Sequence, residues 1–332
     1  MMQSRNDKRA RLLPSAALDV LSVSKDLLVR CALYLDSDGL AQLGRTSARF
    51  GIPQTGHQRS WVNEMARRLF LQSATDEERS RVPKYVDESD IGLYRALEQL
   101  RQPLRFDELL GYWFSPQELP ASVTCTNEED NHCYSTATSR HVIRGGKHFV
   151  EFVISEDNGY TLRADKQEVL LGIIRPVSLT NNIDLSADWE GSVDPVLVSL
   201  DPESSTRSEL AAKLRSQRTR KWGDSDIHCC VYTFALGGCS WTDWNEDEEL
   251  ACYEWQVEQE LGDYSKVGLL LDLDEGTLSV FRNGRCLGVM KKGLSGEYCW
   301  FISAASSCTI QMSRGQVPSA DQRSYQRRLR HT

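Results

Sequence analysis

The stretch from Val267 to Met290 constrains the fold of this chain more than any other. It reads as three short β-rich segments separated by two tight turns. The first turn contains Gly276, and the second is Asn283-Gly284. Glycine takes positive φ without steric cost, and Asn-Gly is the strongest short signal for a two-residue hairpin. We therefore interpret Gly276, Asn283 and Gly284 as structural turn residues of a β-meander, a motif that builds a sheet and supplies no catalytic group.

Three segments in this part of the chain resemble the SPRY domain family. They are Gly145 to Ile154, Val169 to Arg175, and Leu271 to Gly288. They occur in the family's order, and the resemblance covers about Phe106 to Met312. It implies a β-sandwich whose loops at one end bind a short segment of another protein.

The N-terminal third has the period of amphipathic helices. Apolar residues between Asp26 and Leu35 share one helix face, the segment Asp36 to Gly39 breaks the helix, and Pro103 ends the helical region. From Phe106 the period changes to two. The predicted fold class is α+β, a small N-terminal helical unit followed by an antiparallel β-sandwich of SPRY-like type. The predicted divisions are a disordered tail (1–20), the helical unit (21–102), the sandwich (103–314) with a long insertion at about 180–225, and a basic tail (315–332).

The insertion is expected to be a loop with one short helix, and we predict disorder for it because long loops in compact domains are functional or disordered. The helical unit resembles an F-box, although the family's proline position falls on Ser24. That resemblance implies an apolar surface that docks on a Skp-type adaptor. The residues that it assigns to adaptor binding are Leu27, Leu28, Leu35, Leu40, Leu43 and Phe50. A plain helical cap on the sandwich is the alternative.

The composition excludes several classes of function. The net charge of −8 argues against nucleic acid as a general partner, and no apolar run approaches the length of a membrane span. The N-terminus has no apolar signal region, and the ten cysteines form no Cys-x-x-Cys pair. We therefore expect reduced thiols in a cytoplasmic protein, with basic residues near the N-terminus leaving a nuclear location open.

Neither a metal site nor a catalytic site is predicted. His228, Cys229, Cys230 and Cys239 suggest zinc at first, but adjacent residues of a strand face opposite sides, so Cys229 and Cys230 do not share one ion. A calcium loop is the sharper alternative, with oxygen ligands at Asp243, Asn245, Asp247, Glu249 and Glu254. Its sixth position is Glu248 where the loop needs glycine. We therefore predict no cofactor, no metal and no catalytic residue.

Peptide contacts are expected near the loop that contains several tryptophans. The predicted peptide-binding residues are Arg175, Trp241, Asp243 and Trp244. Aromatic side chains in loops often anchor interfaces. Trp241 fits a surface anchor or a core strand position equally well, whereas Trp244, beside several acids, is expected at the surface.

The combined resemblances imply a protein-interaction protein without enzymatic activity of its own. The expected role is the substrate-recognition subunit of a Skp–cullin–F-box ubiquitin ligase, which holds a target by a short peptide. The alternatives are a SPRY interaction module or scaffold outside a ligase, and a calcium-binding regulatory protein. Exposure separates the first two, because an F-box has to present Leu28, Leu35, Leu40 and Leu43 partly to solvent.

Overall fold

A computed structural model describes residues 25–56, 58–127, 132–155, 168–196, 205–245, 248–251 and 264–318. The chain divides into two compact units. The first contains the residues up to Ser73 together with Glu88–Arg95, and the second contains Ala74–Asp87 and the residues from Ala96 onward. Helix α6 (Asp90–Arg101) therefore contributes to both units. No helix in the described part of the chain is long and apolar enough to cross a bilayer.

The first unit is helical, as predicted. Its helices are α1 (Lys25–Ala32), α2 (Ser37–Thr46), α3 (Ala48–Gly51) and α4 (Trp61–Ser73), with the start of α6. The predicted break is the start of α2, where the Asp36 carboxylate accepts a hydrogen bond of 2.7 Å from the backbone N–H of Gly39. Ala32, Leu40, Met65 and Ala66 form the buried core of this unit.

A short helix opens the second unit. Helix α5 (Asp76–Arg81) begins with a capping box in which Thr75 and Glu78 satisfy each other's backbone N–H groups. The guanidinium of Arg101, at the end of α6, contacts the Glu78 carboxylate at 2.7 Å. This hydrogen bond lowers the pKa of Glu78 to about 2. Helix α5 and the end of α6 are thus tied together within the same unit.

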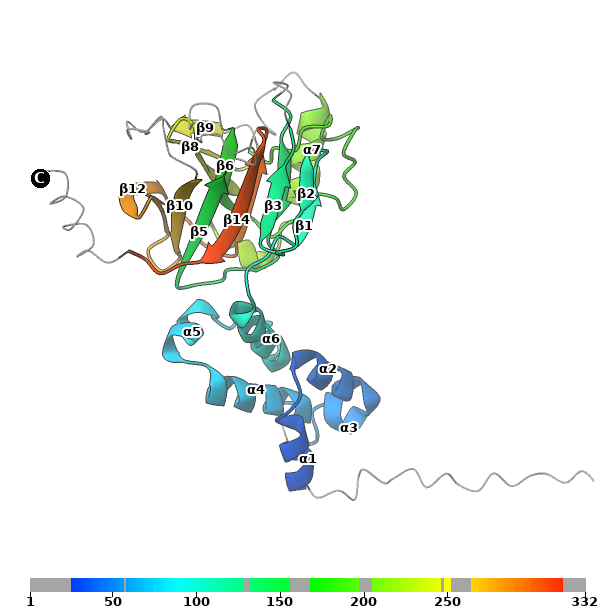
Figure 1. The fold of residues 1–332 in the computed structure, drawn as a ribbon. Coiled ribbons are helices and arrows are strands. Elements are labelled where there is room, and N and C mark those ends of the chain that lie inside the picture. The colour runs from blue at the N-terminus through cyan, green and yellow to red at the C-terminus, as the bar shows by residue number, and fades with distance from the viewer. Residues whose placement is uncertain are drawn as a thin grey trace, which may run out of the picture. The chain divides into compact units, whose positions relative to one another are not determined.

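The rest of the second unit is a sandwich of two antiparallel sheets (Figure 1), which confirms the predicted fold class. In the described residues the first sheet has the order β1-β4-β13-β6-β7-β8-β9, and the second has the order β12-β11-β10-β5-β14-β3-β2. The strands are β1 (Glu108–Leu110), β2 (Phe114–Pro116), β3 (Ser122–Cys125), β4 (Ser135–Thr138), β5 (Lys147–Ser155), β6 (Val169–Ile174), β7 (Cys229–Thr233), β8 (Gly238–Thr242), β9 (Glu248–Ala251), β10 (Tyr264–Asp272), β11 (Thr277–Arg282), β12 (Arg285–Lys292), β13 (Cys299–Ala304) and β14 (Cys308–Arg314).

Alternation along the strands builds the core between the sheets. On β10, Val267, Leu269 and Leu271 point inward and have no exposed surface. Cys229 and Cys230 confirm the same rule on β7, since Cys230 belongs to the core between the sheets and Cys229 to a second core on the outer face. Opposed side chains of this kind do not converge on one ion, and no metal-binding cluster occurs among the described residues.

The insertion covers the outer face of the first sheet. Helix α7 (Ser205–Ser216) and the short 3₁₀ helix η4 (Arg220–Trp222) lie in it. Trp189, Leu214 and Trp222 pack with Phe301 and other residues of the sheet in the second core. The predicted short helix is present, but the predicted disorder is wrong for the described residues of the insertion. Buried apolar contacts of this kind stabilise its loops.

Both turns of the meander have left-handed residues. Gly276 has φ +63°, and a Cβ there would lie 2.8 Å from the carbonyl oxygen of Leu294. Between β11 and β12, Asn283 has φ 48° and Gly284 has φ 78°. These are the backbone angles of a primed two-residue turn, which matches the twist of the flanking strands.

Substitution of Gly284 by valine is expected to destabilise the sandwich by about 1–2 kcal/mol, because a β-branched residue resists positive φ. No atom lies within 4 Å of the position that a Cβ would occupy, so the loss would come from backbone strain alone. Chemical denaturation measures the free energy of unfolding. Gly284→Asn is the matched control, since asparagine tolerates this conformation. Equal stability of the two variants would contradict this account of the turn.

Candidate functional site

A buried arginine organises one end of the sandwich. Arg175 follows β6 and has no exposed surface. One of its terminal nitrogens donates to the carbonyls of Ser295 at 2.8 Å and Glu297 at 3.1 Å, and the other donates to the carbonyl of Ser225 at 2.9 Å. Its guanidinium lies 4.1 Å from the ring centroid of Tyr298. Burial lowers the pKa of Arg175 to about 10, so the group stays charged at neutral pH.

Aromatic rings pack beside this arginine. The imidazole of His228 lies 5.1 Å from the ring centroid of Trp222 and 5.2 Å from that of Trp244. The indole N–H of Trp244 donates to the carbonyl of Pro195 at 2.9 Å, which anchors it to the insertion. Burial, and then the charge of Arg175, lower the pKa of His228 to about 4. The cluster is a packed interior that contains one permanent cation and one neutral histidine.

The four predicted peptide-binding residues do not form an exposed site. Arg175 and Trp244 are fully buried, so the expectation that Trp244 lies at the surface is wrong. Asp243 is 9% exposed, and its carboxylate accepts hydrogen bonds of 2.7 Å from the backbone and side-chain nitrogens of Asn245. Trp241 retains some exposure, with the Lys291 ammonium 3.5 Å from its ring centroid. The insertion, which covers this face, is the physical reason for the difference.

The calcium alternative is only partly within the described structure. The Asp243 carboxylate already binds Asn245 within its own turn. Glu248 and Glu249 lie on β9, which is strand rather than the loop of a helix-loop-helix site. Asp247 and Glu254 fall outside the described residues. The part of this segment that the structure describes has no arrangement of ligands around an ion.

The hairpin between β7 and β8 presents an apolar side chain that the sequence analysis did not single out. Leu236 is at its tip with 67% of its surface exposed. Gly237, with φ 66°, donates its N–H to the carbonyl of Thr233 at 2.9 Å and closes the turn. A leucine between turn residues is a sequence signal for such a tip, but only the pairing of β7 with β8 defines the hairpin.

A second buried guanidinium lies beneath this hairpin. Arg282, at the end of β11, is 7% exposed and stacks at 4.5 Å over the ring of Phe234. One terminal nitrogen donates to the hydroxyl of Tyr232 at 3.3 Å and to the carbonyl of Phe234 at 3.4 Å. Its Nε and its other terminal nitrogen have no acceptor, and no described carboxylate pairs with it. The hairpin end therefore holds a cation with unused donors next to an exposed apolar tip.

The helical unit differs from the predicted adaptor surface at two positions. Leu40 is fully buried and Phe50 is 7% exposed, so neither offers much area to a partner. Leu35 and Leu43 are half-buried. Leu27 and Leu28 lie on α1, but their side chains fall outside what the structure describes. Leu40 has to fill the space between α1 and α4, which removes it from the surface.

Other apolar side chains of this unit are exposed instead. Leu33 is 40% exposed, Tyr34 is 91% exposed and Ile52 is 57% exposed. Leu33 and Tyr34 follow α1, and Ile52 follows α3. A cavity of about 600 Å³ lies in the same unit, lined by apolar Val29, Phe50, Trp61 and Met65 and by several arginines. Exposed large apolar side chains in one small unit are a feature of surfaces that bind another protein.

Among solved structures, the chain is similar to the SPRY domain of human HERC1, with 12% sequence identity, a TM-score of 0.33, and coverage of 61% of this chain and 98% of that chain. It is also similar to the PSpry domain of TRIM65, with 11% identity, a TM-score of 0.37, and coverage of 64% of this chain and 93% of that chain. No family model and no curated protein matches the sequence.

Acid is expected to destabilise the second unit through His228. Its pKa in the folded protein, about 4, is below the ordinary value of 6.5 in the unfolded chain. As the pH falls from 6.5 toward 4, the unfolded state therefore binds a proton that the folded state does not bind, and stability falls by at least about 1 kcal/mol. Urea denaturation at pH 7 and pH 4.5 measures this loss.

The matched variant is His228→Phe, which keeps a ring against Trp222 and Trp244 and removes the titration. It should lose less stability than the wild type between the two pH values. The other acids and histidines are common to both proteins and cancel in the comparison. An identical loss in both proteins would show that His228 does not titrate abnormally.

Proposed function

We propose that this protein is an interaction subunit that holds a short segment of a target on its sandwich and docks its helical unit on a Skp-type adaptor. In this role it is the substrate-recognition subunit of a Skp–cullin–F-box ubiquitin ligase and performs no bond chemistry itself. Its contribution is proximity, because a tethered target meets the ligase machinery at a raised effective concentration. The proposal includes a cytoplasmic or nuclear location, in which free cysteines stay reduced.

The exposed side chains of the helical unit are the observation that carries the proposal. Leu33 and Tyr34 are exposed next to Leu35, one of the residues that the F-box resemblance assigns to adaptor binding, and directly before the Asp36 cap of α2. Burying a leucine or a tyrosine in a partner's groove contributes about 1.5–3 kcal/mol each. The two side chains are consecutive in the chain, and the backbone N–H of Leu33 donates to the carbonyl of Val29, which lines the cavity.

The hairpin end of the sandwich supports peptide binding. The SPRY resemblance implies that loops at one end hold a short protein segment. At the β7–β8 hairpin, Leu236 offers an apolar contact, and Arg282 lies beneath it with two buried nitrogens that have no acceptor. A carboxylate that reached this guanidinium would form charge-assisted hydrogen bonds, which are stronger than neutral ones. The target segment is therefore proposed to combine an apolar residue with an acidic one.

A non-ligase interaction module is the second candidate. The burial of Leu40 and Phe50 favours it, because two of the leucine and phenylalanine positions assigned to adaptor binding are used for internal packing. In that case the helical unit would be a structural element or would bind a different partner. Direct binding to a purified Skp-type adaptor separates the two candidates.

Replacement of Tyr34 by aspartate is expected to weaken binding to a purified Skp-type adaptor at least tenfold, because a carboxylate enters an apolar groove at high cost. The fold should be unchanged, since Tyr34 is 91% exposed. Leu71→Asp is the matched control: Leu71 is also exposed, at 47%, and lies on α4 of the same unit. Calorimetric titration provides the affinities.

Failure of the wild-type chain to bind the adaptor would refute the ligase role and leave the interaction module. If Tyr34→Asp and Leu71→Asp both bind like the wild type, the adaptor uses another surface.

Selection from a random peptide library on the full chain is expected to enrich peptides with an acidic residue close to an apolar one. Leu236→Asp should reduce the affinity for these peptides at least tenfold, since it removes the apolar contact and repels the acid. Leu119→Asp is the control, because Leu119 is 58% exposed on a different loop. Enrichment of peptides without acids, or equal binding by Leu236→Asp, would refute the assignment of this end as the peptide site.

A further inference from the structure

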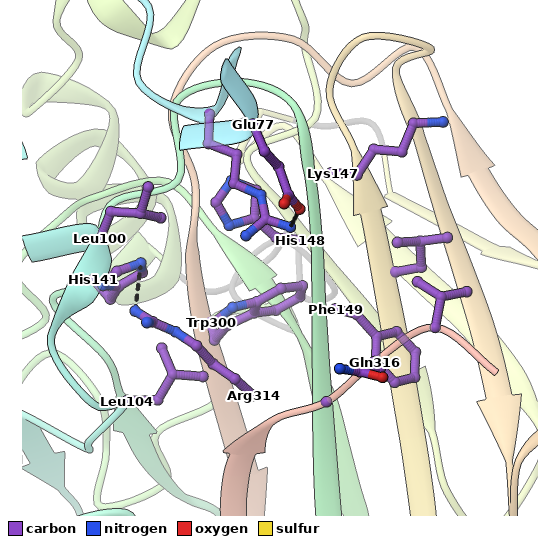
Figure 2. A pocket seen from close by; sticks show the side chains of 14 residues that line it. Glu77, Leu100, Leu104, His141, Lys147, His148, Phe149, Trp300, Arg314 and Gln316 are labelled. Atoms are coloured by element: carbon purple, nitrogen blue, oxygen red, sulfur yellow. Dashed lines mark hydrogen bonds and ion pairs between the residues drawn. The ribbon is translucent and has the colours of Figure 1, made fainter. Parts of the chain in front are cut away.

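A cavity of about 440 Å³ lies in the second unit, and it is separate from the β7–β8 hairpin and from the cavity of the helical unit (Figure 2). The start of β5 and the end of β14 form one side, and α5 and the end of α6 form another. Figure 2 shows His141, His148 and Arg314 directed toward the same space, with Phe149 and Trp300 beside them. Its size is within the range of small-molecule sites.

Two guanidinium groups line the cavity. Arg81 comes from α5 and Arg314 from the end of β14. Burial, and then the charge of Arg81, lower the pKa of Arg314. The Nε of Arg81 is buried without an acceptor, and Arg314 makes no ion pair with any described carboxylate. Two positive charges that line one cavity repel each other, and an anion bound there relieves that repulsion.

Two histidines face the same space and are held neutral. Nε2 of His141 accepts from Arg314 at 3.5 Å, since a guanidinium only donates. Nε2 of His148 donates to the carbonyl of Gly145 at 2.9 Å. Burial and the neighbouring guanidinium groups lower the pKa of His141 to about 4 and that of His148 to about 3. The cavity therefore repels a further positive charge.

Acidic groups balance only part of the positive charge that lines the cavity. Glu77 is the one carboxylate among the lining residues, and it pairs at 2.7 Å with Arg81 on the solvent side, where 72% of the Glu77 side chain is exposed. The third cation, Lys147, is already paired with Asp272 at 2.8 Å. Arg314 is left without an ion pair to a described carboxylate, and the Nε of Arg81 is left without a hydrogen-bond acceptor. Most of the remaining side chains of the lining are apolar, among them Leu100, Leu104, Phe149, Leu270 and Trp300.

We propose that this cavity binds a small organic anion in which a phosphate or carboxylate group is attached to an apolar body. The oxyanion lies between Arg81 and Arg314, because planar guanidinium groups match the geometry of both phosphate and carboxylate oxygens. The apolar body packs against Phe149, Leu100 and Leu104. The site is independent of the adaptor surface and of the hairpin end.

The charge of the cavity argues against the chain's own C-terminal residues as its occupant. Gly315, Gln316 and Val317 line it, and the residues that follow in the sequence include Arg323, Arg327, Arg328 and Arg330. A basic segment would add to the repulsion between Arg81 and Arg314. A free anion relieves that repulsion and supplies acceptors for the unused donors.

Phenyl phosphate is the first probe, because it combines a dianion with one aromatic ring. Calorimetric titration into the full chain at constant ionic strength is expected to show 1:1 binding. Inorganic phosphate, which lacks the ring, should bind at least tenfold more weakly, and phenol, which lacks the charge, should not bind. The affinity of benzoate, compared with that of phenyl phosphate, shows whether a carboxylate or a phosphate on a phenyl ring binds more tightly. A tyrosine-phosphorylated peptide tests whether the same chemistry is accepted from a protein side chain.

Arg314→Gln and Arg81→Gln are each expected to weaken phenyl phosphate binding at least tenfold. Arg285→Gln is the matched control, since Arg285 is an exposed arginine on β12 that does not line the cavity. The proton resonances of His141 and His148 should shift during the titration of the wild type, which locates the ligand even if one arginine variant does not fold. Absence of binding at 10 mM probe, binding of phenol equal to that of phenyl phosphate, or equal losses in Arg314→Gln and Arg285→Gln would overturn the proposal.

Discussion

The buried guanidinium of Arg175 is the interaction on which one end of the sandwich depends. Removing a cation from water is expensive, and its cost is offset here by three carbonyl acceptors and by the face of Tyr298. The carbonyls belong to two segments that are far apart in sequence, around Ser225 and around Ser295 to Glu297. The arginine therefore fixes the loops before β7 and before β13 relative to β6. Burial, and then the charge of Arg175, lower the pKa of His228, so that a neutral imidazole packs beside the indole rings of Trp222 and Trp244.

The insertion converts one sheet into a layer with two buried faces. A sandwich needs only the core between its sheets, and the outer face of each sheet is free to carry polar residues. In this protein β6 is buried along its whole length, because the insertion packs Trp189, Leu214 and Trp222 over it. Tryptophans that an exposed loop would present to a partner are buried in this second core instead. What the surface retains is a small set of exposed apolar side chains, among them Tyr34 and Leu236.

Charge is distributed unevenly over a chain that is acidic overall. The net charge is −8, yet Arg175, Arg282 and the pair Arg81 and Arg314 lie where carboxylates are scarce. Both terminal nitrogens of Arg175 donate to carbonyls of the protein and only its Nε lacks an acceptor, whereas Arg282 has two nitrogens without an acceptor and Arg314 makes no ion pair with a described carboxylate. This difference separates a structural cation from those available to a ligand. It also makes acidic partners compatible with a protein whose net charge would repel them.

The local signals in the sequence were enough for the secondary structure of the meander and of the helical unit. Asn283-Gly284 predicts a primed turn because few other dipeptides tolerate two positive φ angles, and the alternation on β10 predicts which side chains face inward. The opposition of Cys229 and Cys230 follows from strand geometry and needs no tertiary information. Such features depend on residues that are close together in the sequence, so the residue types are enough to predict them.

Burial of the candidate site residues was decided only by the tertiary structure. Whether Trp244 faces solvent depends on an insertion that ends some twenty residues earlier, and whether Leu40 reaches a partner depends on α4. The cavity between α5, β5 and β14 is lined by residues as far apart in the sequence as Glu77 and Val317. No local pattern indicates that Arg81 and Arg314 line the same cavity. The sequence determines what each segment prefers to form. Which faces are covered, and which charges remain without partners, follows from long-range packing that a single segment does not encode.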